Sequence, residues 1–127
     1  MIQGGLALVG LDERVLLVGQ RALERNVPIV GLWATDHNQA LIASLRFGCC
    51  AFASPLEPLQ QAQRVLFSES PGVEFPAHLI CLDVRQLECS GERVSLSRPE
   101  VHWQDWLTAL GFEVVVRSEE HTSELQS

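Results

Sequence analysis

Short apolar runs alternate with amphipathic stretches along this chain, and the alternation limits the possible folds more than any other feature. The runs with the length and character of strands are 6–10, 28–33, 49–53, 64–68, 94–96 and 112–116. The stretches between them with apolar residues at helical spacing are 12–25, 37–47, 56–62, 77–89 and 102–110. A helix between two strands makes those strands parallel, so the sequence predicts a mostly parallel sheet.

The first two apolar runs indicate how this sheet is covered. LALVG and PIVGLW are apolar on both faces, which is typical of strands buried between two layers of helices. The sequence therefore predicts a doubly wound, three-layer α/β fold of the Rossmann-like type over residues 1–116. Helix boundaries are marked too: Asp36 is placed to cap the helix over 37–47, and Gly48 to end it.

Composition excludes several classes of function. The net charge is -7 and there is no Lys, so a nucleic-acid or anionic-membrane surface is not expected. No apolar run is long enough to span a bilayer, and no secretory signal opens the chain. The four Cys form no C-x-x-C pair and no His follows at zinc-ligand spacing, so no metal site is predicted. A reducing, cytoplasmic setting is the expectation.

The final segment, residues 117–127, differs from the rest of the chain. It reads RSEEHTSELQS, directly after a Val-rich run, and resembles the translation of a common sequencing adapter. A native acidic tail is the alternative. We expect the segment to be a non-native tail and the domain to be truncated at its C-terminal end.

The turn after the first strand is the candidate phosphate-binding site, because open parallel sheets bind ligands at the carboxyl ends of their strands. Here the dinucleotide fingerprint G-x-G-x-x-G reads Gly10-Leu11-Asp12-Glu13-Arg14-Val15, so only its first glycine is present. The backbone of Gly10 and Leu11 is expected at a pyrophosphate, on the helix N-terminus. Asp12 would crowd and repel that group, and Val15 would hold the helix away from the strand. A purely structural turn is the alternative.

The end of the second strand would meet the adenosine ribose of such a cofactor. An acid at this place hydrogen-bonds the ribose hydroxyls. Asp36 lies within reach of it and is the candidate ribose-binding residue, although it suits a helix cap equally well.

From the fourth predicted strand on, the spacing of several motif residues resembles that of the glucose–fructose oxidoreductase / inositol dehydrogenase family of nicotinamide-dependent enzymes. Its T-P-x-x-x-H segment is matched by Ser70-Pro71 and, further on, His78. Its A-G-K-H-V-x-x-E-K-P segment is matched by Gly91-Glu92-Arg93-Val94 and Ser97-Arg98-Pro99. The resemblance implies an N-terminal domain that binds NAD or NADP, with Ser70 and Pro71 beside the nicotinamide ribose. It places Arg98 at the substrate as the candidate catalytic residue, where the family has Lys; Arg can hold an anion but not transfer a proton.

Two other interpretations stay open. The opening strand, helix and Ile29-Val30-Gly31 also resemble formyltransferases of the methionyl-tRNA type, but no H-x-S-x-L-P segment follows. The third interpretation is a Rossmann-like module that has lost its cofactor. Under the first hypothesis the expected partner is a small-molecule substrate, and the full-length protein could form a homo-oligomer. Fold alone does not decide between these functions.

Overall fold

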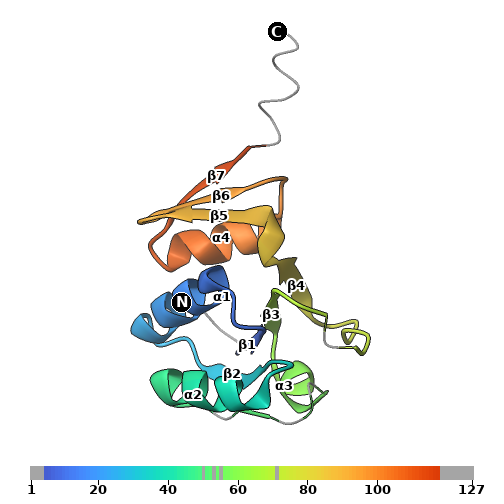
Figure 1. The fold of residues 1–127 in the computed structure, drawn as a ribbon. Helices are drawn as coiled ribbons and strands as arrows, with labels where there is room; N and C mark the ends of the chain where they lie inside the picture. Colours follow the sequence, from blue (N-terminus) through green and yellow to red (C-terminus); the bar gives the residue numbers. More distant parts are fainter. Residues whose placement is uncertain (1–4, 50, 53, 55, 71, 118–127) are drawn as a thin grey trace, which may run out of the picture. The chain divides into compact units, whose positions relative to one another are not determined.

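Two groups of strands organise the chain, each within its own compact unit. The computed structural model describes residues 5–49, 51–52, 54, 56–70 and 72–117 (Figure 1). The chain divides into one unit over Ile2–Val84 and another over Arg85–Ser127. The tail predicted to be non-native lies outside the described residues from 118 onward.

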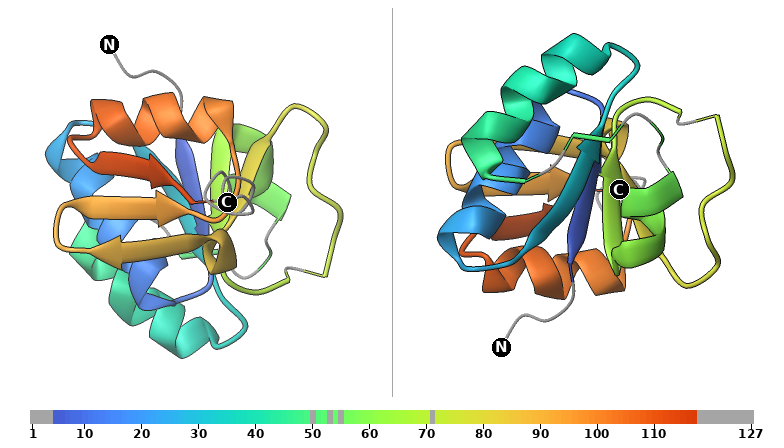
Figure 2. Two further views of the ribbon diagram at one scale, coloured as in Figure 1. Left: turned by 90° about the horizontal axis from the view of Figure 1, so that it is seen from above. Right: turned by 90° about the horizontal axis from the view of Figure 1, so that it is seen from below.

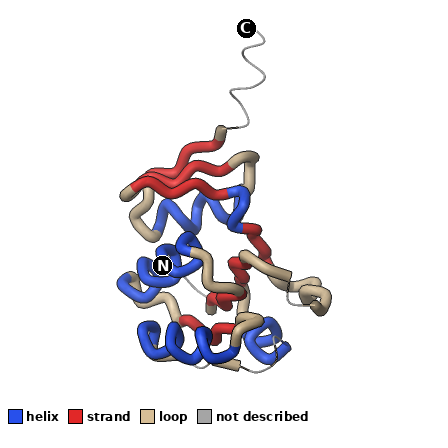
Figure 3. The backbone as a smooth tube through the Cα atoms, in the orientation of Figure 1, coloured by secondary structure: helices blue, strands red, loops and turns tan. Residues whose placement is uncertain are grey.

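The first unit is a parallel sheet with its helices. Its elements are β1 (Leu6–Val9), α1 (Glu13–Glu24), β2 (Ile29–Trp33), α2 (His37–Phe47), α3 (Leu56–Gln61), β3 (Arg64–Phe67) and β4 (Ile80–Asp83). The strand order is β2-β1-β3-β4, and every described pairing between these strands is parallel. The opening strand therefore lies inside the sheet, with a neighbour on each side. Figure 3 colours the helices blue and the strands red along the backbone.

The segment 49–53, predicted as a strand, is described at residues 49, 51 and 52. Among its described residues, Ala51 makes a single parallel bridge with Leu32, and the Phe52 N–H donates to the Leu32 carbonyl over 3.0 Å. β1 pairs with one side of β2, so this bridge lies on the other side of β2, at the outer edge of the sheet. The segment is confined between the end of α2 and the start of α3, which leaves little room for a longer ladder. Cys50 and Ala53 lie outside the described residues.

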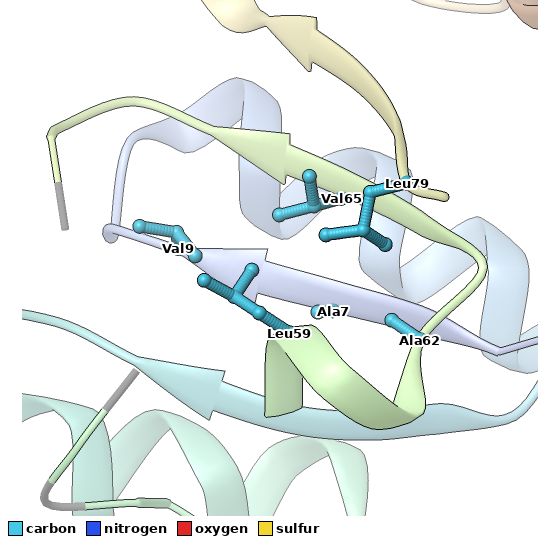
Figure 4. Packing of buried hydrophobic residues seen from close by; sticks show 6 residues of the cluster. All are labelled: Ala7, Val9, Leu59, Ala62, Val65 and Leu79. Carbon is cyan, nitrogen blue, oxygen red and sulfur yellow. The ribbon is translucent and has the colours of Figure 1, made fainter. Parts of the chain in front are cut away.

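Helices cover both faces of this sheet. A Cβ placed on Gly19 of α1 would lie 2.9 Å from Leu8 Cδ1 and 3.2 Å from the Phe47 ring, so α1 and the end of α2 share the face that carries Leu8. Ala7 and Val9 point the other way and join a buried cluster with Leu59 of α3 (Figure 4). Successive strand residues alternate between faces. The predicted three-layer, doubly wound α/β fold is confirmed for this unit, whereas the strands predicted at 94–96 and 112–116 belong to a separate sheet and not to this one.

The predicted ends of α2 are also confirmed. The Asp36 carboxylate accepts the Gln39 N–H over 3.2 Å, which satisfies one of the first-turn amides that have no acceptor within a helix. Gly48 ends the helix in the left-handed conformation at φ 64°, where its N–H donates to the Ser44 carbonyl.

The second unit is a small sheet with one helix. Its elements are β5 (Leu87–Ser90), β6 (Arg93–Leu96), α4 (Val101–Ala109) and β7 (Glu113–Val116), and the short 3-10 turn η1 (Val84–Gln86) precedes them. The order is β5-β6-β7, with β5 antiparallel and β7 parallel to β6 (Figure 2). The α4 residues Trp103 and Trp106 are buried, with their rings 5.1 Å apart and edge to face.

The helix predicted over 77–89 is wrong. This stretch forms β4, η1 and β5 instead. Ile80, Leu82 and Val84 recur every second residue, which is the strand period, and β4 pairs with β3 along its length. Sheet pairing therefore decides the structure of a sequence whose apolar residues fit both periods, and β-branched Ile80 at the start of β4 favours the strand.

Membrane spans and metal clusters are both absent from the part of the chain that the structure describes. None of the helices there has the length and apolar character needed to cross a bilayer. No three side chains of His, Cys, Asp or Glu among the described residues gather as ligands for a metal ion.

Candidate functional site

The crevice at the carboxyl end of β1 is the place where this topology offers a ligand site. From the end of β1 the chain passes through α1 to β2, on one side of β1, whereas from the end of β3 it passes to β4, on the opposite side. β1 and β3 are neighbours, so the chain turns away in opposite directions from two adjacent strands. A sheet of this kind binds its ligands at this switch point, outside the strand ends.

Gly10 forms the turn at the switch point. Its φ is 98°, a conformation that residues with a Cβ rarely adopt. Its N–H donates to the Trp33 carbonyl over 2.8 Å, which fastens the turn to the end of β2. A Cβ added at Gly10 would lie 1.9 Å from Ser68 Oγ and 3.2 Å from Glu69 Cγ. Only glycine fits between the ends of β1 and β3, as the sequence predicts for this position.

Asp12 and Arg14 form a charged pair at the start of α1. Asp12 is the N-cap residue, and its Oδ1 accepts both the Arg14 N–H and Arg14 Nε–H, each over 2.8 Å. Arg14 Nη2 donates to the other carboxylate oxygen over 3.0 Å. Asp12 thus accepts the hydrogen bond of one amide at the helix N-terminus, which is then not available to a ligand. The bound guanidinium offsets the charge of the Asp12 carboxylate.

The pair makes stability depend on pH in a predictable way. The side-chain hydrogen bond from Arg14 lowers the pKa of Asp12 below 3.8, although burial opposes the shift. A lowered carboxyl pKa stabilises the folded state at pH values above the pKa of the unfolded chain, and this contribution is lost as the pH falls through the pKa of the folded state.

Asp12→Asn keeps a capping side chain without the charge. We expect wild type to melt higher than Asp12→Asn at pH 6, and the difference to shrink as the pH falls below 3.8, the ordinary pKa value of the carboxyl. Thermal melts across the acid range measure this difference, and a difference that stays constant with pH would contradict the assignment.

Glu69 connects the ends of β3 and β2. Its Oε2 accepts the Thr35 N–H over 3.3 Å, and its Oε1 accepts the Thr35 hydroxyl over 2.5 Å. Since β1 lies between these two strands and Glu69 Cγ lies close to Gly10, the side chain crosses the turn at Gly10. A carboxylate is thereby held at the end of β2, although it belongs to the segment after β3.

The close approach of α1 to the sheet is made at Gly19 rather than at the third glycine position of the fingerprint. Val15, which occupies that position, is fully buried. One turn further along the helix, Gly19 lies against Leu8, where a side chain would collide. The helix thus docks closely at Gly19, and the expectation that Val15 holds it away from the strand stays a prediction.

The remaining predicted cofactor residues have the following places. Leu11 lies between Gly10 and the N-cap and is partly buried. The Asp36 carboxylate is engaged as the cap of α2, and its role at a ribose stays a prediction. The exposed Ser70 accepts the Gly72 N–H over 3.3 Å within its own loop, and Pro71 lies outside the described residues.

Two residues singled out by family spacing lie elsewhere. His78 does not open a helix; it lies in a turn before β4, with Nε2 3.0 Å from the Ala62 carbonyl oxygen. Arg98 belongs to the second unit, in the segment between β6 and α4, where it is largely exposed and lies 3.9 Å from a Glu100 oxygen. Its role at a substrate stays a prediction.

Three residues of the crevice were missed by the sequence reasoning: Thr35, Ser68 and Glu69. They are the first polar side chains after β2 and β3, and Ser68 Oγ lies 3.4 Å from the Val9 carbonyl oxygen. Polar residues directly after adjacent parallel strands are the signal that could have found them, since such strand ends meet at one edge.

Similarity to known proteins lies in the structure rather than in the sequence. No family model matches the chain, and no curated protein matches it. UDP-N-acetylglucosamine 3-dehydrogenase from Acidithiobacillus ferrooxidans matches at TM-score 0.57 and 15% identity, over 91% of this chain and 38% of that one. A Bacteroides fragilis protein described as an NADP oxidoreductase matches at 0.65 and 8%, over 95% and 64%. An imine reductase from a Pseudomonas species matches at 0.60 and 9%, over 90% and 55%.

These matches define a class of fold. The chain has the Rossmann-like α/β architecture found in these oxidoreductases, which agrees with the parallel sheet and its switch point. At such identities the likeness concerns the fold alone. The chain spans less than two thirds of each of these three proteins.

Proposed function

We propose that the Ile2–Val84 unit binds the dinucleotide NAD or NADP across the carboxyl ends of its strands, as the cofactor domain of an oxidoreductase. The observation that carries the proposal is Gly10, a positive-φ turn at the switch point where a side chain would strike Ser68. This turn brings bare backbone to the start of α1, where a diphosphate would meet the helix N-terminus.

The residues at the turn fit a diphosphate, although with one opposing group. A helix N-terminus has several amides without an internal acceptor, and Asp12 satisfies the one at Arg14. The others, with the Arg14 guanidinium, suit an anion. The Asp12 carboxylate repels it, so we expect weaker binding than a glycine at this position would give.

When bound, the nicotinamide supplies hydride transfer, and the chain's own residues hold and orient it. Gly10 and Leu11 would face the diphosphate. Ser70 and Pro71 would lie by the nicotinamide ribose, and Arg98 would hold an anionic group of a small-molecule substrate. The last three assignments rest on the resemblance to the glucose–fructose oxidoreductase / inositol dehydrogenase family. A module that has lost its cofactor is the second candidate, and the Asp12–Arg14 pair on the helix N-terminus favours it.

Titration with NADH and NADPH tests the proposal. The melting temperature and tryptophan fluorescence of the chain are followed as each nucleotide is added up to millimolar concentration, with adenosine as a control that lacks the diphosphate. Saturable binding of at least one dinucleotide is expected, with a stabilisation of about 2.7 kcal/mol when the ligand reaches 100 times its Kd. No response to either dinucleotide at millimolar concentration would favour the module that has lost its cofactor.

A further inference from the structure

We infer that Glu69 makes this site select NAD over NADP, by holding a carboxylate where the 2′-phosphate of NADP would lie. The inference rests on the proposed dinucleotide function and adds to it which of the two cofactors is taken. It assigns the choice to a residue after β3 rather than to Asp36, the nearest acid after β2.

The position of the carboxylate comes from its two contacts with Thr35. Thr35 follows β2 by two residues, and both its N–H and its hydroxyl donate to Glu69. In a dinucleotide bound at the switch point, the adenosine ribose lies at the end of β2. Each carboxylate oxygen has lone pairs beyond those used by Thr35, so Glu69 can still accept from ribose hydroxyls.

Asp36, the nearest acid after β2, has a structural role of its own as the N-cap of α2. Its Oδ1 accepts the Gln39 N–H, which turns the carboxylate toward the helix N-terminus. The chain thus supplies the ribose-binding acid from the opposite side of β1. The same Glu69 side chain packs beside Gly10. Its aliphatic part and its carboxylate are therefore both held in place along the strand ends.

The distribution of cations in this unit agrees with the inference. Arg14 is the cation of the β1–α1 turn, where it is bound to Asp12. The others lie in the last turn or just after the end of a helix, or at the first residue of a strand: Arg21, Arg25, Arg46 and Arg64. In strand–helix–strand units these places belong to the amino edge of the sheet, away from the ribose. Among the described residues of this unit, the arginine at the carboxyl edge is thus Arg14, which is bound to Asp12, whereas a 2′-phosphate at the end of β2 would meet the Glu69 carboxylate.

The decisive comparison is between NADH and NADPH, which differ only in the 2′-phosphate. Kd values are measured by isothermal titration for wild type, Glu69→Gln and Glu74→Gln. In Glu69→Gln the new side chain keeps an oxygen that accepts from Thr35 but loses the charge. Glu74 is an exposed carboxylate further along the same loop, so Glu74→Gln matches the change in net charge.

We expect wild type to bind NADH at least about tenfold more tightly than NADPH, from the repulsion between like charges at short range. Glu69→Gln should reduce this ratio by about tenfold, mainly through tighter NADPH binding, and Glu74→Gln should leave it unchanged. Thr35→Val removes the hydroxyl that donates to Glu69 but keeps the backbone N–H bond, so it loosens the carboxylate and should reduce the ratio in part. This variant also keeps the comparison available if Glu69→Gln does not fold.

The outcomes separate the inference from the function on which it rests. Equal binding of NADH and NADPH by wild type, or a ratio that Glu69→Gln and Thr35→Val leave unaltered, would overturn the role of Glu69 while leaving dinucleotide binding intact. Binding of neither nucleotide would overturn the proposed function, and the inference with it.

Discussion

Gly10→Ala is expected to lower the free energy of unfolding by about 3 kcal/mol, from a strained backbone and a steric collision together. The φ of 98° is unfavourable for any residue with a Cβ, and the new methyl group would lie 1.9 Å from Ser68 Oγ. The turn is also held by the Gly10 N–H on the Trp33 carbonyl, so relief would require breaking that hydrogen bond. Urea denaturation followed by circular dichroism measures the change.

Gly48→Ala is the matched control for this prediction. Gly48 also has a positive φ, 64°, but a Cβ placed there meets nothing within 4 Å. Its substitution reports the cost of the backbone conformation alone, which we expect to be about 1 kcal/mol. Equal effects of the two substitutions would mean that the ends of β1 and β3 do not close on Gly10.

The fold could be predicted from the sequence wherever local signals agreed with tertiary pairing. Asp36 and Gly48 mark the ends of α2 by hydrogen bonds that lie within a few residues, and both predictions hold. The stretch over 77–89 failed because its apolar residues fit two periods. The pairing of β4 with β3, a contact distant in sequence, decided between them.

The site shows the same division between local and distant contacts. Gly10 could be recognised because a glycine that ends a strand before a helix is a local pattern. Glu69 could not, because its role depends on Thr35, which lies 34 residues away in the sequence. Asp36 could be proposed because it lies close to the end of β2; the structure shows its carboxylate capping α2, and its role at a ribose stays a prediction.

Asp12→Gly is expected to tighten NADH binding by at least about tenfold, the largest effect on affinity that we predict for a single residue of the turn. The substitution restores the second glycine of the fingerprint, removes a negative charge beside the diphosphate and frees the Arg14 N–H for the ligand. It also releases the Arg14 guanidinium, which then has an anion to bind instead of its present partner. Isothermal titration with NADH measures the gain.

Stability should fall in this variant, because the Asp12–Arg14 ion pair is lost and glycine at an N-cap costs a further few tenths of a kcal/mol relative to aspartate. A gain in affinity would then come from the site and not from a better-folded protein. Glu13→Gln is the matched control: Glu13 is exposed in the same first turn, so the net charge changes equally, but its carboxylate is not the N-cap acceptor. If Asp12→Gly bound NADH no better than Glu13→Gln did, the diphosphate would not lie at the start of α1, and the dinucleotide would have to be placed elsewhere or abandoned.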